Sequence, residues 1–223
     1  MAEKYNSGIH VHTAEDIYDQ TFTMQNYHKS VVERFHKAGA LQFAKTILVH
    51  CLHLNDNERK IIAESPVYVA ENIESNLNNN VGFFNGRGIS KKVMLGTDGM
   101  HSNMLRSLKA AYIIGQTSEQ LAMTEACERL NRTHEYIASN NFKGDAANNL
   151  VVLDYASPTP VTRDNYFGHL VFGIESADIL HVIAKGKIIV RDRKLLTFDE
   201  EAVSKKLSDT AASLWYVYKK QKV

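Results

Sequence analysis

The sequence predicts an α/β protein with a parallel sheet, followed by a small β unit and a C-terminal helix. Short apolar runs at 8–13, 46–52, 67–70 and 93–95 have the length of strands and alternate with stretches of helical character. Parallel strands need crossover connections, so this alternation favours a parallel sheet. After residue 143 the pattern changes to short strands separated by turns, and we therefore expect two domains, at 1–143 and 144–223.

The first domain is expected to contain four helices between and after its strands. Apolar residues in 29–39 recur at helical spacing, and Gly39 would end that helix. A second helix is expected at 56–65, with Asn55 or Asp56 as its N-cap. Asparagine and glycine are frequent in 76–88, which predicts an irregular loop. The last two helices are predicted at 104–115 and 118–129.

The second domain is expected to be a small antiparallel β unit. Its predicted strands lie at 150–155, 169–172, 180–185 and 187–191. Gly186 is placed to form the hairpin turn between the last two. Residues 199–220 predict an amphipathic helix that closes the sequence.

The composition is that of an ordinary globular chain. Of its 223 residues, 44% are hydrophobic and 23% are charged, and 26 Lys and Arg balance 25 Asp and Glu. A net charge of +1 favours a small-molecule substrate over nucleic acid or a membrane surface as partner. Cys51 and Cys127 form neither a disulfide framework nor a CxxC pair, and no apolar run approaches the roughly 20 residues of a membrane span. We therefore expect a cytoplasmic protein.

Polar residues follow three of the four strands predicted in the first domain. His12 and Glu15 come with the first strand, His50 with the second and Asp98 with the fourth. The carboxyl ends of parallel strands meet at one edge of a sheet, so these side chains are expected to converge. A zinc-type ion is bound by imidazoles and carboxylates. The sequence therefore predicts a divalent-metal site in which Glu15 contacts substrate or transfers a proton.

Each of these residues also has an ordinary structural interpretation. His10 and His12 lie on the same side of a strand and could be a hydrogen-bonded pair. His50 could be a core histidine whose hydrogen bonds are satisfied, and Asp98 could cap its own turn. Spacing alone leaves both interpretations open.

Four motifs in sequence order resemble the later barrel motifs of the amidohydrolase superfamily. They are His10-Val-His12-Thr-Ala-Glu15, Leu48-Val49-His50, Ala70-Glu71-Asn72-Ile73-Glu74-Ser75-Asn76-Leu77-Asn78-Asn79 and Leu95-Gly96-Thr97-Asp98-Gly99. The resemblance is closest to the chlorohydrolase and nucleobase-deaminase branch, and within it to aminohydrolases of the SsnA type. It extends over nearly the whole chain.

The resemblance implies a (β/α)₈ barrel with an attached β-sandwich, of which this chain would supply strands five to eight and the later sandwich strands. It assigns His12 as a metal ligand, Glu15 as a proton carrier, and Asp98 as both ligand and base. His50 would orient the nucleophile or the substrate, and we expect Asn76 to contact the substrate as well. Zinc is the preferred metal, with iron and manganese as alternatives. The implied reaction is hydrolysis of a non-peptide carbon–nitrogen bond, such as deamination of a purine-like or triazine-like ring.

One family feature has no counterpart in this sequence. Family members carry a metal-binding His-x-His pair on the first barrel strand, whereas His10-x-His12 fits the fifth strand because Glu15 follows and His50 lies further along. Four strands would also leave open sheet edges. We therefore expect a partner, either a second copy in a homo-oligomer or a chain that supplies the missing barrel half.

Two other functions stay open at this point. The chain could be a truncated, non-catalytic module for binding or assembly, or one half of a split enzyme. An unrelated doubly wound α/β protein is a third possibility, but a Gly-x-Gly-x-x-Gly phosphate loop is absent from the sequence.

Overall fold

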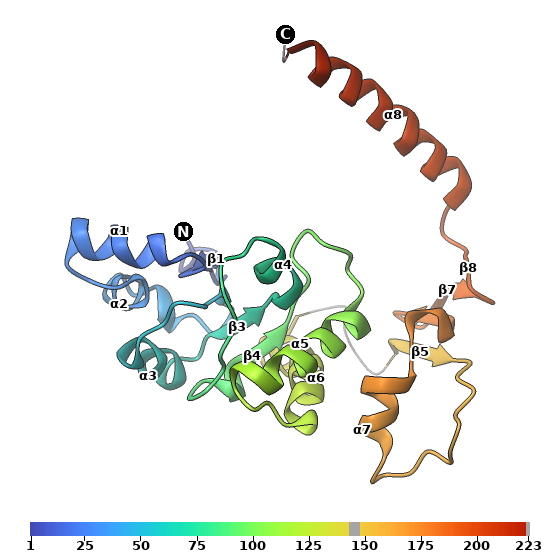
Figure 1. Cartoon of the computed structure of the whole chain (residues 1–223), viewed down its shortest axis with the longest axis horizontal. Coiled ribbons are helices and arrows are strands. Elements are labelled where there is room, and N and C mark those ends of the chain that lie inside the picture. The colour runs from blue at the N-terminus through green and yellow to red at the C-terminus, as the bar shows by residue number, and fades with distance from the viewer. Residues whose placement is uncertain (143–147, 222–223) are drawn as a thin grey trace. The chain divides into compact units, whose positions relative to one another are not determined.

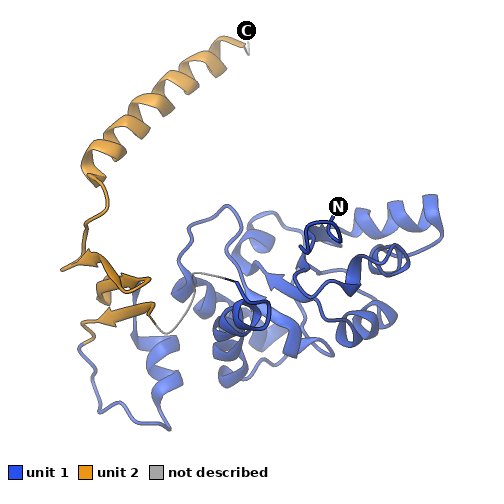
Figure 2. Ribbon diagram, turned by 180° about the vertical axis from the view of Figure 1, so that it is seen from behind, with its two compact units in different colours: residues 1–143, 156–176 blue, residues 144–155, 177–223 orange. Residues whose placement is uncertain are grey.

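The structure is a computed structural model that describes residues 1–142 and 148–221, and these form two compact units (Figure 2). Within the described residues, the first unit contains 1–142 and 156–176, and the second contains 148–155 and 177–221. The division departs from the predicted one at 156–176, a segment that belongs with the parallel sheet. Val171 explains the difference, because it is buried in the hydrophobic core of the first unit.

The first unit is built on a four-stranded parallel sheet, which confirms the predicted α/β class. Its strands are β1 (His10–Thr13), β2 (Ile47–His50), β3 (Tyr68–Glu71) and β4 (Val93–Leu95), in the spatial order β1-β2-β3-β4 (Figure 1). All three neighbouring pairs are parallel. The carboxyl ends of the strands therefore lie at one edge of the sheet, and β1 and β4 are its edge strands.

Helices connect and follow these strands. They are α1 (Ile17–Tyr27), α2 (Val31–Lys37), α3 (Asp56–Glu64), α4 (Ile73–Asn78), α5 (Met104–Ser118) and α6 (Met123–Ser139), with 3₁₀ turns at Ala40–Gln42 (η1) and Ser90–Lys92 (η2). Asn55 caps α3 as predicted, because its side chain accepts a hydrogen bond from the backbone N–H of Glu58. Ser118 ends α5, whereas the sequence predicted that a new helix would start there.

Two of these helices were not predicted. α1 lies in a polar stretch, and it begins with a capping box formed by Asp16 and Asp19. α4 occupies the start of the predicted 76–88 loop and extends back to Ile73, which is buried in the core. In α4, burial of Ile73 can outweigh a local preference for loop, whereas α1 buries only Thr23 and depends on its cap.

The core of the first unit lies on one face of the sheet. Leu48, Val69 and Leu95 point from successive strands into this core, where side chains from α3, α5 and α6 meet them. Side chains alternate between the two faces of a strand, so Val49 and Met94 point to the opposite face. That face lines a separate cavity, described below.

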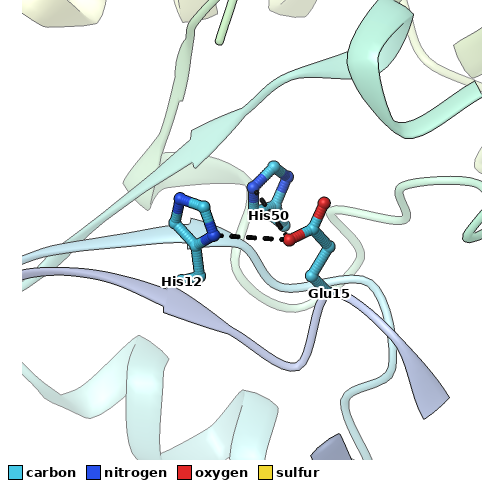
Figure 3. Close-up of side chains that lie close together, drawn as sticks. All are labelled: His12, Glu15 and His50. Atoms are coloured by element: carbon cyan, nitrogen blue, oxygen red, sulfur yellow. Dashed lines mark ion pairs between the residues drawn. The ribbon is translucent and has the colours of Figure 1, made fainter. Parts of the chain in front are cut away.

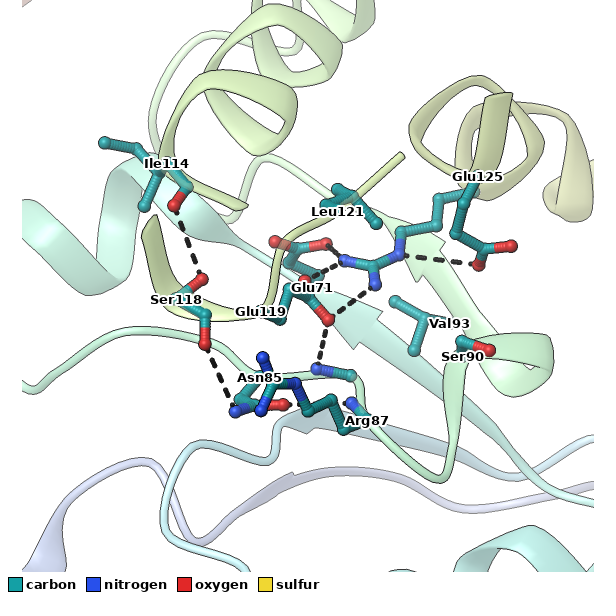
Figure 4. Close-up of polar contacts among 12 residues, drawn as sticks. Glu71, Asn85, Arg87, Ser90, Val93, Ile114, Ser118, Glu119, Leu121 and Glu125 are labelled. Carbon is teal, nitrogen blue, oxygen red and sulfur yellow. Dashed lines mark hydrogen bonds and ion pairs between the residues drawn. The ribbon is translucent and has the colours of Figure 1, made fainter. Parts of the chain in front are cut away.

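A buried ionic network ties α6 to the carboxyl end of β3 (Figure 4). The Arg129 side chain is 0% exposed; its Nη1 lies 2.9 Å from Glu71 Oε2 and 2.8 Å from Glu119 Oε1, and its Nη2 lies 2.9 Å from Glu119 Oε2. Glu119 also accepts a hydrogen bond from the backbone N–H of Gly86. Burial raises the pKa of Glu71 to about 7, and the negative charge of Glu119 adds to the rise, whereas Arg129 opposes it.

This network should make the stability of the chain depend on pH. Because the pKa of Glu71 rises from 4.5 to about 7 on folding, its carboxyl group is protonated in the folded state and ionised in the unfolded state between these pH values. The contribution of Glu71 to the free energy of unfolding is therefore lost as pH rises through this window, by up to about 3 kcal/mol. Urea unfolding at pH 5 and pH 8 should show a smaller pH dependence for Glu71→Gln than for the wild type. The exposed Glu64→Gln is the control. An equal change in the free energy of unfolding between pH 5 and pH 8 for all three proteins would refute the raised pKa of Glu71.

The second unit contains a four-stranded antiparallel sheet. Its strands are β5 (Leu150–Leu153), β6 (Ile179–Ala184), β7 (Lys187–Arg191) and β8 (Lys194–Leu195), in the order β5-β6-β7-β8. The predicted hairpin turn is confirmed, since Lys185 and Gly186 both have positive φ. α8 (Glu200–Gln221) ends the unit, and its side chains are exposed. Among the described helices, none combines the length and apolar character that crossing a membrane requires.

The predicted strand at 169–172 is wrong. After α7 (Tyr166–Gly168), the segment His169–Gly173 forms a π-helical turn (η3) in the first unit. The backbone N–H of Ile174 donates to the carbonyl of His169, so the segment satisfies its peptide groups locally instead of pairing with a strand.

Both cysteines are buried and free. Burial raises the pKa of the Cys127 thiol to about 11, and it raises the pKa of the Cys51 thiol as well. Burial therefore disfavours the thiolate form of both cysteines.

Candidate metal centre

Three side chains meet at the carboxyl ends of β1 and β2 (Figure 3). The parallel register places Thr13 opposite His50, so the two strands end side by side. Beyond Thr13 the backbone turns at Ala14, which has φ 47° and brings Glu15 back toward the strand ends. His50 itself has φ 72°, a conformation that is uncommon for a residue with a side chain. Backbone turns at Ala14 and His50 therefore bring the three side chains together.

The carboxylate of Glu15 lies between two imidazoles. Its Oε2 is 3.4 Å from His12 Nδ1 and 3.4 Å from His50 Nε2. The two rings lie 4.8 Å apart between centroids, at an interplanar angle of 85°. Within the described part of the chain, these three residues form a group whose possible ligand atoms all lie within 4.8 Å of one another. The His50 side chain is 0% exposed, whereas that of His12 is 66% exposed.

His50 is oriented by a second residue. Its Nδ1 lies 2.7 Å from Asn76 Oδ1, and this oxygen accepts a hydrogen bond when the proton is on Nδ1. The lone pair is then on Nε2, which is buried and has no hydrogen-bond partner. Metal-binding histidines commonly show this arrangement, in which one ring nitrogen donates to a polar group and the other binds the ion. The residues present therefore fit a divalent metal.

Asp98 follows β4 and is held by its own hydrogen bonds. The hydroxyl of Ser75 donates to Oδ2 at 2.6 Å, and the backbone N–H of Gly99 donates to Oδ1 at 2.8 Å. The hydrogen bonds from Ser75 and Gly99 lower the pKa of Asp98. Asp98 is not in the group of ligand atoms around Glu15. Its predicted roles as ligand and base stay predictions.

His12 and Asp98 lie at the same cavity, on the face of the sheet opposite the hydrophobic core. Both residues line a cavity of about 380 Å³, together with residues from all four strands. The rest of the lining includes His10, Val49, Ala70 and Met94, with Thr133, Tyr136 and Ile137 of α6. A solute in this cavity would contact His12 and Asp98 from one side.

Asn76 is buried and contacts His50. Its side chain is 0% exposed and its Oδ1 is hydrogen-bonded to the imidazole, so in this structure it supports His50, and its predicted contact with substrate stays a prediction. Sequence reasoning also missed Ser75, because the α4 helix that carries both residues was taken in part as a loop. The motif from Ala70 to Asn79 contains Ser75 and Asn76, but the residues that they contact, Asp98 and His50, are distant in sequence.

A second polar group near the Asp98 turn was also missed. Glu74 of α4 lies 2.5 Å from His101 Nε2 and 2.7 Å from Arg106 Nε. The backbone N–H of Asn103 donates to His101 Nδ1, so both ring nitrogens of His101 are engaged. These contacts fasten the loop after Asp98 to α4.

Removing the Asn76 side chain should weaken metal binding without removing a ligand. Loss of an outer partner of a metal-binding histidine typically costs about 10- to 100-fold in affinity. We expect this loss for Asn76→Ala, measured by zinc competition against a chromogenic chelator. The exposed Asn78→Ala in the same helix is the matched control, and a thermal melt shows that each variant is folded. Equal zinc affinity for both variants would refute the positioning role.

The fold and the site together define an α/β protein with a candidate metal centre at the carboxyl ends of parallel strands. The family model of the Amidohydrolase family matches residues 1–138. The chain belongs to the Amidohydrolase family.

Several curated relatives of the chain are deaminases. The chain is 27% identical over 232 residues to a 5-methylthioadenosine/S-adenosylhomocysteine deaminase of Syntrophomonas wolfei, an alignment that covers 96% of this chain and 53% of that protein. It is 30% identical over 217 residues to a 5'-deoxyadenosine deaminase of Methanococcus vannielii, which covers 91% of this chain and 51% of that protein. The chain thus spans about half the length of these relatives.

Solved structures show the same fold over a similar share of their length. A zinc-bound adenosine deaminase from Xanthomonas campestris has a TM-score of 0.82 at 20% identity and matches 96% of this chain and 52% of that chain. A guanine deaminase of E. coli has a TM-score of 0.71 at 24% identity and matches 86% of this chain and 50% of that chain. The parallel and antiparallel sheets described above correspond to about half of such structures.

Proposed function

We propose that this chain carries one half of a hydrolytic deaminase, including part of its metal site, and that the enzyme acts on an amino-substituted, purine-like ring. The observation that carries the proposal is the buried Nε2 of His50, which has no hydrogen-bond partner and faces Glu15 and His12. Deaminases of adenosine derivatives among the relatives support the substrate class. An aminotriazine is the second substrate class, because a triazine hydrolase shares the fold with a TM-score of 0.77.

Zinc is the metal that we propose for the site. His12 and His50 would hold it as neutral imidazoles, with Glu15 between them. When bound, the ion lowers the pKa of a water molecule toward roughly 7, so that hydroxide is available near neutral pH. The zinc-bound relative supports this choice. Iron and manganese also suit these ligands.

The side chains of the site have separate tasks in the proposed reaction. The oxygen of water bonds to the ring carbon, the bond from that carbon to the exocyclic nitrogen breaks, and ammonia leaves with a proton taken from the water. Glu15 is 3.4 Å from both imidazoles and is placed to accept that proton and return it to the departing nitrogen. Asp98 stays ionised because of its lowered pKa, and it can accept a hydrogen bond from the nucleophile.

The test is zinc content and ammonia release for the purified full chain, with adenosine, 5'-deoxyadenosine and an aminotriazine as substrates. We expect Glu15→Gln to lower turnover by about 10²- to 10⁴-fold, the usual contribution of a general acid–base group. The exposed Glu64→Gln should be unaffected. Bound zinc without turnover of any substrate would contradict catalysis and favour a non-catalytic binding module. Absence of bound zinc would refute the metal centre itself.

A further inference from the structure

A second cavity of the first unit is lined mainly by cationic side chains. It has a volume of about 470 Å³, within the size range of small-molecule sites. Its lining comes from α3 and from the loop before β4, and it consists of Asp56, Arg59, Lys60, Asn85, Arg87 and Gly88. None of these residues lines the cavity that His12 and Asp98 share. This cavity is therefore distinct from the candidate metal centre.

The cationic cavity does not depend on the edges of the parallel sheet. α3 connects β2 to β3, which are the two inner strands, and it packs on the face of the sheet that carries the hydrophobic core. The edge strands β1 and β4 contribute no residue to the lining. The walls of the cavity thus come from this chain, whatever pairs with β1 and β4.

Arg59 is held in place by the loop that it faces. Its Nη1 donates to the carbonyl of Asn85 at 2.6 Å and to that of Arg87 at 3.0 Å. Among the described residues, no acceptor engages its Nε or Nη2. A guanidinium presents five donors in a fixed fork that matches the oxygens of a phosphate. The two hydrogen bonds therefore fix the guanidinium and leave donors for a ligand.

The loop at 85–88 is fixed from its other side as well. The N–H of Arg87 donates to Asn85 Oδ1 at 3.0 Å. The N–H of Gly86 donates to Glu119 Oε2 at 2.6 Å, and Glu119 belongs to the buried ionic network (Figure 4). This wall of the cavity is preformed, so a ligand would not have to order it on binding.

Positive charge dominates the lining. Arg87 is exposed, and its guanidinium has no hydrogen-bond or ion-pair partner in the part of the chain that the structure describes. Lys60 lies 4.0 Å from Glu64, but both side chains are exposed and such a pair contributes little. The one carboxylate of the lining, that of Asp56, stands against three cations. The lining therefore has a net charge of +2.

We propose that this cavity binds the phosphate group of a small molecule, with the guanidinium groups of Arg59 and Arg87 as its donors. A phosphate monoester carries close to two negative charges at neutral pH, which matches the net charge of the lining. Arginine binds phosphate through paired, charge-assisted hydrogen bonds. The organic part of an ester would then lie against the backbone at Gly88, where no atom lies within 4 Å of the position that a Cβ would take.

The test is isothermal titration of the full chain with inorganic phosphate, ribose 5-phosphate and ribose. The chain is first dialysed against a chelator, so that no metal competes for phosphate. Both phosphates should bind, and ribose should not. Tighter binding of ribose 5-phosphate would identify an ester as the ligand and equal binding would identify free phosphate, and either result supports the site. Absence of binding by both phosphates would overturn the proposal.

Two substitutions with opposite expected effects locate the binding. Arg87→Gln should lower the affinity for phosphate by about 10- to 100-fold, the usual value of a hydrogen bond to a charged group. Asp56→Asn should raise the affinity, because its carboxylate repels the anion. The matched control is Arg163→Gln, which removes an exposed guanidinium outside the cavity and should bind as the wild type does.

A thermal melt of each variant shows that it is folded. Wild-type affinity for Arg87→Gln, a loss for Asp56→Asn, or an equal loss for Arg87→Gln and Arg163→Gln would each overturn the proposal. The titration needs neither zinc nor turnover, so its result does not depend on the proposed function.

Discussion

Replacing Arg129 by methionine is expected to lower the free energy of unfolding by about 3–5 kcal/mol, the usual cost of removing one partner from a buried ion pair. Arg129 is fully buried, and its guanidinium contacts both Glu71 and Glu119. Without it, these carboxylates are left in a low-dielectric environment with no opposing charge. The variant should stay folded only to the extent that the carboxyl groups take up protons.

Urea unfolding of the full chain measures this effect. Arg163→Met is the matched control, because Arg163 is exposed and its removal should change stability by less than about 0.5 kcal/mol. Adding Glu71→Gln to Arg129→Met should recover part of the loss, since one unpaired carboxylate is then neutral. A loss below about 1 kcal/mol for Arg129→Met would show that the network does not support the fold.

Replacing His12 by alanine is expected to weaken zinc binding by more than about 100-fold, beyond the usual effect of losing an outer partner. His12 is one of two imidazoles beside Glu15, and catalytic zinc usually has three protein ligands. Its side chain is 66% exposed, so the substitution should leave the thermal melt almost unchanged. Loss of zinc would then report on the site and not on folding.

Isothermal titration with zinc, together with metal analysis after dialysis, measures this loss. His36→Ala removes an exposed histidine of α2 that is outside the group of possible ligands, and it should bind zinc as the wild type does. Equal zinc affinity for the two variants would mean that His12 is not a ligand. The resemblance of its motif to a metal-binding motif would then be misleading.

Local pattern was enough to predict the parallel sheet and the strand ends that carry His12 and His50. Short apolar runs separated by helical stretches leave few other arrangements. Parallel strands share their direction, so residues at their carboxyl ends meet whatever the details of packing. α1 could also have been found, since Asp16 and Asp19 are spaced as a capping box.

The sequence by itself determined the class of fold and the family, and it predicted that His12, Glu15 and His50 would converge at the ends of neighbouring strands. Only the tertiary structure decided that Asn76 supports His50, that Ser75 holds Asp98, and that the segment around His169 is helical. It also decided the Arg129 network, which joins residues 58 and 10 positions apart. Such contacts depend on which side chains are left facing each other after the chain packs, and no local periodicity records that.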